Sequence, residues 1–158
     1  MHRLWFQSFR GLAGLAEIRP EWDALLAQSP DARFYHDPRW HEALQRHVLG
    51  SEVHYLLCRR GRETVALVPL EAVQRRSGPV TLRALRLPEH PVSDLADVLV
   101  APGQRRRGLF GALLRYLRQG FPGTWDCLEL DRFTERSVLK GELGAEVYNG
   151  RADAWEPV

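Results

Sequence analysis

The chain has 158 residues, which is enough for one domain with a hydrophobic core and short for two domains of ordinary size. Hydrophobic residues make up 44% of it and charged residues 27%, a composition that excludes a disordered, fibrous or disulfide-stapled protein. The 22 basic and 20 acidic residues give a formal net charge of +2, which offers no general electrostatic attraction for nucleic acid. We therefore expect a single globular domain over residues 1–158.

The cysteines and the hydropathy pattern bear on the cellular compartment. Cys58 and Cys127 each lie in an apolar run, where a thiol usually packs as a small hydrophobic group and forms no disulfide. The chain has no uninterrupted apolar stretch of about 18 residues, and its first residues do not form a signal peptide. These features predict a cytoplasmic protein without a membrane span.

The first third of the chain predicts one strand followed by two helices. Residues 3–9 are expected to form the strand, and Pro20 is expected to open a short helix that ends before Ser29. Pro38 is typical of the first position of a second helix. Helical spacing gives that second helix a buried stripe of Trp40, Ala43, Leu44, His47 and Val48.

The remainder predicts strands with a helix among them. Segments 53–58 and 64–73 flank a Gly61 turn and form an antiparallel hairpin, and 80–87 and 94–100 add two strands. A helix over about 109–117 follows, and further strands are expected at 127–130 and 145–149 with a short helix over 135–143 between them. The helix over 109–117 has a buried stripe of Leu109, Ala112, Leu113, Tyr116 and Leu117. This alternation predicts an α/β fold with a mixed central sheet and helices on both faces.

Residues 97–117 carry the clearest chemical signal. A strand passes through Pro102 and an arginine-rich turn directly into an amphipathic helix. The first turn of a helix has unpaired N–H groups and the positive end of the helix dipole, so it suits a pyrophosphate. Gly108 permits close approach of the backbone, and Arg105, Arg106 and Arg107 add positive charge. The alternative is a solvated arginine-rich turn that caps a surface helix.

This segment resembles the acyl-CoA signature of the GNAT acyltransferases, R/Q-x-x-G-x-G/A, which follows the fourth strand of that fold. Arg105 and Gly108 match it, whereas Phe110 stands at the last Gly/Ala position and Gly111 comes next. The resemblance implies a single GNAT-like domain that transfers an acyl group from acetyl-CoA or another acyl-CoA to an amine. The cofactor-binding residues that it implies are Val98, Leu99, Val100, Gln104, Arg105, Arg106, Arg107, Gly108, Leu109 and Phe110.

From Pro20 to Gly144 the chain is also similar to the first half of CelD-type proteins, through PEWDALL, FYHDPRWHEAL, VALVPLEAV, PVSDLADVLV and WDCLELDRF. CelD-type proteins are linked to cellulose or exopolysaccharide biosynthesis, are related to FemABX-type aminoacyl transferases, and contain two GNAT-like halves. The resemblance leaves two hypotheses open. The chain is an N-acyltransferase, or it is a non-catalytic half that packs against a second GNAT-like domain or a second copy. The one form in which the resemblance allows a nucleic-acid partner is a tRNA-linked donor.

Acyl transfer to an amine needs a base for the amine and an acid for the leaving thiolate. His90, Asp94 and Asp97 precede or occupy the strand that would border the thioester, so they are the candidate bases. Asp97 and Leu99 should point to one face of this strand, and Val98 and Val100 to the other. Each aspartate has an alternative role as a turn or cap residue. At the position of the tyrosine acid that the resemblance implies, this chain has Lys140, which is expected to be a solvated helix residue.

A histidine-rich segment raises the question of a metal site. His36, His41 and His47 lie near Asp37 and Glu42. Their spacings do not place two imidazoles on one helix face as the i, i+4 spacing of helical zinc sites does. We therefore expect no metal.

Overall fold

The computed structural model describes residues 3–88, 97–104, 106–130 and 147–148. Within these residues the helices and strands follow the expected order, and the helix expected over 135–143 lies outside them. The helices and strands are β1 (Leu4–Arg10), α1 (Gly11–Gln28), the 3-10 helix η1 (Phe34–His36), α2 (Pro38–His47), β2 (Val53–Arg60), β3 (Glu63–Ser77), β4 (Val80–Arg86), β5 (Leu99–Val100), α3 (Arg106–Gln119), β6 (Cys127–Glu129) and β7 (Val147–Tyr148).

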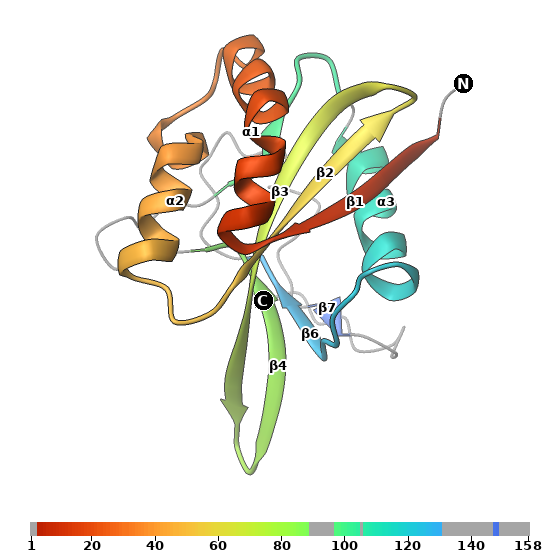
Figure 1. The fold of residues 1–158 in the computed structure, drawn as a ribbon. Helices are drawn as coiled ribbons and strands as arrows, with labels where there is room; N and C mark the ends of the chain where they lie inside the picture. Colours follow the sequence, from red (N-terminus) through yellow and green to blue (C-terminus); the bar gives the residue numbers. More distant parts are fainter. Residues whose placement is uncertain (1–2, 89–96, 105, 131–146, 149–158) are drawn as a thin grey trace.

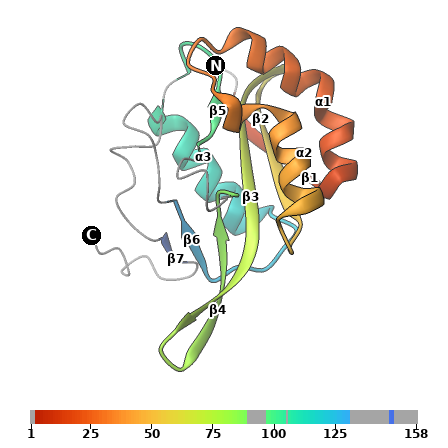
Figure 2. The ribbon, with the colours of Figure 1, turned by 90° about the vertical axis from the view of Figure 1, so that its left-hand side faces the viewer.

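The strands form one mixed sheet in the order β1-β2-β3-β4-β6-β7, with β5 paired to β3. The β4–β6 pair is parallel and the other pairs are antiparallel. Helices α1 and α2 lie on one face of the sheet and α3 lies on the other (Figures 1 and 2). The predicted α/β architecture, a mixed sheet with helices on both faces, is confirmed.

The long strand β3 carries two shorter strands along one edge. Its end pairs with β4 from Glu71 to Ser77, and an earlier part pairs with β5 at Ala66 and Leu67. Both partners are antiparallel to β3, so β4 and β5 run in the same direction, one after the other. Pro69 lies between the two paired parts and has no N–H to donate to a neighbour, which fits an interruption of the ladder there.

Two hydrophobic cores fill the space between the sheet and its helices. On the α3 face, the predicted stripe is confirmed, because Leu109, Ala112, Leu113 and Leu117 are buried and Tyr116 packs beside them. On the opposite face, Ile18, Trp22 and Leu25 of α1 pack onto Tyr55 of β2 and Leu67 of β3, among others.

Helix α1 begins earlier than the sequence predicted. It starts at Gly11, and Pro20, the expected first residue, lies inside the helix. Pro20 and Ala16 are both on the exposed side, so water can bond the Ala16 carbonyl that Pro20 leaves without an N–H partner. The buried positions of the helix extend back to Gly14, where a Cβ would lie 2.6 Å from the Phe9 backbone, so glycine lets α1 pack closely on β1.

Helix α2 begins at Pro38 as predicted, with the Asp37 carboxylate accepting a hydrogen bond from the Arg39 N–H (2.8 Å) as its N-cap. The predicted buried stripe was wrong apart from Leu44. The buried residues of α2 are Pro38, His41 and Leu44, whereas Ala43, His47 and Val48 are exposed. The helix turns its polar His41 inward because the ring finds a backbone acceptor and the face of Trp22 there.

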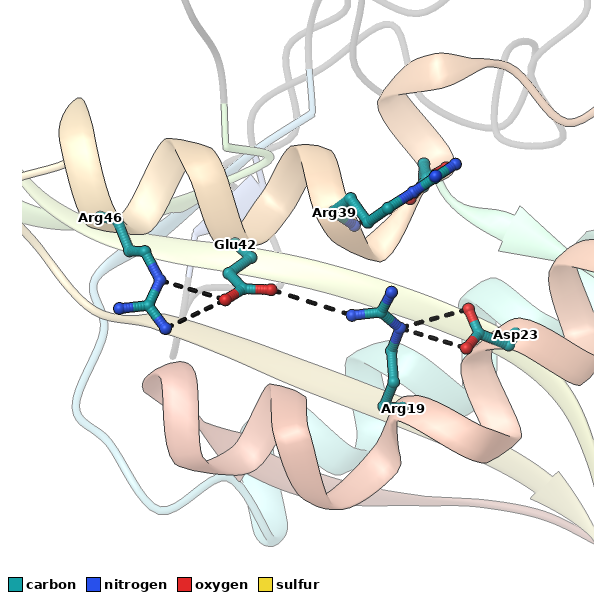
Figure 3. A network of polar contacts seen from close by, with 6 residues as sticks. Arg19, Asp23, Arg39, Glu42 and Arg46 are labelled. Carbon is teal, nitrogen blue, oxygen red and sulfur yellow. Dashed lines mark hydrogen bonds and ion pairs between the residues drawn. The ribbon is translucent and has the colours of Figure 1, made fainter.

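An ionic network joins the solvent sides of α1 and α2 (Figure 3). Glu42 of α2 contacts Arg46 on its own helix at 3.0 Å and Arg19 of α1 at 3.8 Å. Arg19 in turn contacts Asp23 at 3.1 Å. These ion pairs are partly exposed, so they help to orient the two helices but contribute little to the free energy of folding.

Two other sequence expectations concern the thiols and the membrane. Cys58 and Cys127 are buried free thiols, as expected, and burial raises the pKa of Cys58 to about 12. None of the helices in the described part of the chain is long and apolar enough to cross a bilayer.

Candidate functional site

A tight turn connects β5 to α3. The Gln104 N–H donates to the Ala101 carbonyl oxygen at 3.2 Å, with Pro102 and Gly103 between them. Gly103 has a φ of 76°, so this Pro-Gly turn has the signature of type II. This turn leads the chain from the sheet edge into α3, whose first residues are Arg106 and Arg107. Arg105 lies outside the described residues.

The first two turns of α3 have an open side. A Cβ added at Gly108 or at Gly111 would meet no atom within 4 Å, and both residues are exposed. Leu109 is 1% exposed and anchors the helix in the core. Phe110 packs against the same core, which places the bulky residue of the signature under the helix. The start of α3 therefore offers its backbone to a ligand without steric obstruction at Gly108.

The two faces of β5 meet different cores. Val98 and Val100 pack with the α3 core, and Leu99 packs with the α1 core. The predicted alternation of these three side chains is confirmed. Asp97, two residues before Leu99, is 8% exposed.

The edge of β5 that faces away from β3 is partly occupied. The Ala101 N–H donates to Val65 of β3 at 2.8 Å, so by alternation the backbone groups of Val98 and Val100 face the opposite edge. The Val98 N–H donates to the Asp97 carboxylate at 2.7 Å. The Val100 carbonyl accepts from the Ser29 hydroxyl at 3.1 Å, and Ser29 is the residue that follows α1. Two of the groups expected to pair with pantetheine thus have side-chain partners.

Of the three candidate bases, only Asp97 lies among the described residues, since His90 and Asp94 do not. Gln104, another predicted cofactor contact, contacts the Arg60 guanidinium. Sequence reasoning considered the buried residues His36 and His41 only as metal ligands, and it missed the buried Glu71. The sequence did contain a signal for Glu71, because a charged residue within the apolar run VALVPLEAV of a buried strand needs a polar partner.

His36, at the end of η1, is the first of two buried imidazoles. It is 7% exposed, and its Nδ1 accepts a hydrogen bond from the Arg33 N–H at 2.9 Å. Burial lowers the pKa of His36 to about 4, so the ring is neutral at pH 7. Nε2 has no hydrogen bond of normal geometry, although an interaction with the Val98 backbone raises the pKa of the ring, as a carbonyl acceptor does.

His41 is the second buried imidazole. Its Nε2 donates to the Tyr35 carbonyl at 2.9 Å, and its Nδ1 has no hydrogen-bond partner. The ring centroid lies 5.1 Å from that of Trp22, and burial lowers the pKa of His41 to about 4. Within the described part of the chain, no three His, Cys, Asp or Glu side chains gather as metal ligands would.

Glu71 forms a polar cluster on the same face of the sheet. It accepts from the Ser51 hydroxyl at 2.6 Å and from Arg86 Nε at 3.2 Å, and its side chain is 4% exposed. Arg86 is the last residue of β4 and pairs with Glu71 in the ladder. The cluster therefore lies at the end of β4.

No family model, curated protein or solved structure matches the chain.

Proposed function

We propose that the chain is an acyl-CoA-dependent N-acyltransferase of the GNAT type, which transfers an acyl group from acetyl-CoA or another acyl-CoA to an amine. The observation that carries this proposal is the open side of α3 at Gly108, directly behind the tight turn from β5. In this arrangement the pyrophosphate accepts hydrogen bonds from the first N–H groups of α3, and Arg105, Arg106 and Arg107 supply charge.

The pantetheine arm then extends from the start of α3 along the edge of β5, past Val100 toward Val98. The thioester lies near Asp97, which is a candidate base for the acceptor amine together with His90 and Asp94. The acceptor approaches from the α1 and α2 face. Buried polar groups of the described residues are gathered on that face, as expected where a polar acceptor has to be held.

One observation favours the competing hypothesis, a non-catalytic GNAT-like half that packs against a catalytic domain. The Val98 N–H and the Val100 carbonyl already have side-chain partners, Asp97 and Ser29. A domain whose strand edge is closed in this way would serve as a wall or support for its partner.

Calorimetric titration with CoA and acetyl-CoA separates the two hypotheses. The informative variant is Gly108→Trp, because its new side chain enters open space and does not disturb the core. Arg118→Trp places the same side chain on an exposed position in the last turn of α3 and is the matched control. We expect saturable binding by wild type and the control, and at least about a tenfold weaker affinity in Gly108→Trp, the equivalent of losing about 1.4 kcal/mol.

A folded wild-type chain that binds neither CoA nor acetyl-CoA would overturn the enzyme proposal and favour the partner half. Equal affinity in Gly108→Trp and wild type would show that the ligand binds away from the start of α3.

A further inference from the structure

The hydroxyl of Ser29 lies between two backbone carbonyls that belong to different elements. Its Oγ is 2.8 Å from the Leu25 carbonyl oxygen in the last turn of α1 and 3.1 Å from the Val100 carbonyl oxygen of β5. A serine hydroxyl has one hydrogen, so it donates to one of these carbonyls at a time or is shared between them. The Ser29 hydroxyl is therefore one donor with two alternative acceptors.

The contact with Leu25 completes the end of α1. In a helix that continued regularly, the Ser29 N–H would donate to the Leu25 carbonyl, but here it donates to the Leu26 carbonyl at 3.1 Å. The hydroxyl of the same residue takes its place at Leu25, as side chains do for the free carbonyls of a helix end. Because Leu25 remains as an acceptor, the hydroxyl can leave Val100 without becoming an unpaired donor.

At β5 the same hydroxyl occupies a group that a neighbouring extended chain would use. The Val100 carbonyl faces the edge of β5 that is not paired with β3, and Val100 is only partly buried. Two residues earlier, the Asp97 carboxylate accepts from the Val98 N–H at 2.7 Å. Ser29 and Asp97 thus supply one donor and one acceptor to this edge, which is what the amide groups of an adjacent extended chain supply.

We propose that the hydrogen bond from Ser29 to Val100 is an autoinhibitory contact on the acyl-CoA site. The hydroxyl holds the Val100 carbonyl until acyl-CoA binds. It then yields this carbonyl to an amide N–H of the pantetheine arm and donates to Leu25 alone. The inference rests on the proposed acyltransferase function. Ser29 is in this sense a positioning residue that lowers the affinity for the pantetheine arm, because the bound ligand has to replace its contact.

The test is calorimetric titration of the full chain with CoA, and Ser29→Ala is the variant that removes the contact. Ser29→Thr keeps a hydroxyl, and threonine is compatible with the extended backbone at this position (φ −98°, ψ 102°). Ser8→Ala is the matched control, because it removes a partly buried hydroxyl that contacts His54 and not β5.

We expect Ser29→Ala to bind CoA about fivefold more tightly than wild type, the size of one neutral hydrogen bond. The bond to Leu25 is missing from this variant with and without ligand, so its loss cancels from the affinity. The competing bond to Val100 is lost only from the free chain. Ser29→Thr and Ser8→Ala should bind CoA like wild type. A serine that only stabilised the fold would not raise the affinity when it is removed.

Two further measurements locate the effect. The phospho-ADP fragment of CoA lacks the pantetheine arm and does not reach the edge of β5, so Ser29→Ala and wild type should bind it equally. Ser29→Cys is the variant closest in size to serine, and its thiol is a weak donor. It should shift the affinity for CoA in the same direction as Ser29→Ala, which keeps the test decisive if the alanine variant does not fold.

Two results would overturn the inference and leave the proposed function standing. The first is that wild type binds CoA and the folded Ser29 variants without a hydroxyl bind it equally or more weakly. The second is that these variants gain as much affinity for the phospho-ADP fragment as for CoA, because the contact would then not act on the pantetheine arm. If wild type binds neither CoA nor acetyl-CoA, the proposed function fails together with the inference.

Discussion

The two faces of the sheet differ in the chemistry of what they bury. The core beneath α3 consists of apolar side chains, from Phe6 on β1 to Leu128 on β6. The buried polar residues found in the described part of the chain are His36, His41, Glu71 and Asp97. By strand alternation and helix packing they belong to the α1 and α2 side (Figure 2).

This difference gives the two faces different contributions to stability. An apolar face gains free energy from burial alone and holds α3 in place behind β5. A face that buries imidazoles and carboxylates has to satisfy each of them with a partner and loses stability where it does not. The polar face is therefore the one expected to respond to pH, to removal of single hydrogen bonds and to ligands.

The largest effect is expected at the centre of the polar face. Trp22 is fully buried, its indole N–H donates to the His36 carbonyl at 2.8 Å, and its ring contacts His41 and Tyr55. Trp22→Ala should lower the free energy of unfolding by about 3–5 kcal/mol, measured by urea denaturation. Trp5→Ala is the control, because Trp5 is 44% exposed. Equal losses in both variants would contradict the central role of Trp22.

A smaller effect is expected from pH. The pKa values of His36 and His41 are lowered to about 4 in the folded chain, whereas an unfolded histidine titrates near 6.5. The unfolded state then binds more protons between these values, so stability present above pH 6.5 is lost as pH falls toward 4. The loss is up to about 3 kcal/mol for each ring.

The measurement is the urea midpoint from pH 7 to pH 4.5 for wild type and His41→Met. Carboxylates are common to both proteins, so the difference in slope reports on the imidazole. Parallel curves would show that the pH dependence of stability does not come from burying His41 in its neutral form.

The smallest effects compare a buried with a partly exposed carboxylate. Glu71→Gln leaves Ser51 and Arg86 facing a neutral amide, and we expect a loss of about 1–3 kcal/mol in the free energy of unfolding. Glu42→Gln breaks the network between α1 and α2 and should cost at most about 1 kcal/mol (Figure 3). If Glu42→Gln and Glu71→Gln lost the same free energy of unfolding, the exposed contacts would stabilise the fold as much as the buried ones.

The sequence was sufficient where the signal was local. The Gly61 turn and its flanking apolar runs identified the β2–β3 hairpin, and the spacing from Leu109 to Leu117 identified the buried side of α3. The start of α2 followed from Asp37 and Pro38, because an N-cap and a first-turn proline act through their immediate neighbours. The alternation along 98–100 likewise followed from the period of a strand.

Other features depended on partners distant in the chain. Pro20 inside α1 and His41 on the buried side of α2 contradict the local rules, and the contacts with Trp22, Tyr35 and the sheet explain why. The same holds for the candidate site. The sequence indicated the turn and helix start around Gly108, whereas Ser29 came to β5 only through folding.

By itself, then, the sequence determined the alternation of helices and strands and the segment that resembles an acyl-CoA signature, because both are written in neighbouring residues. The tertiary structure decided which polar side chains are buried together and which of their atoms lack partners. Such pairings join residues far apart in the chain, such as Trp22 with the His36 carbonyl and Ser51 with Glu71, and no local pattern specifies them.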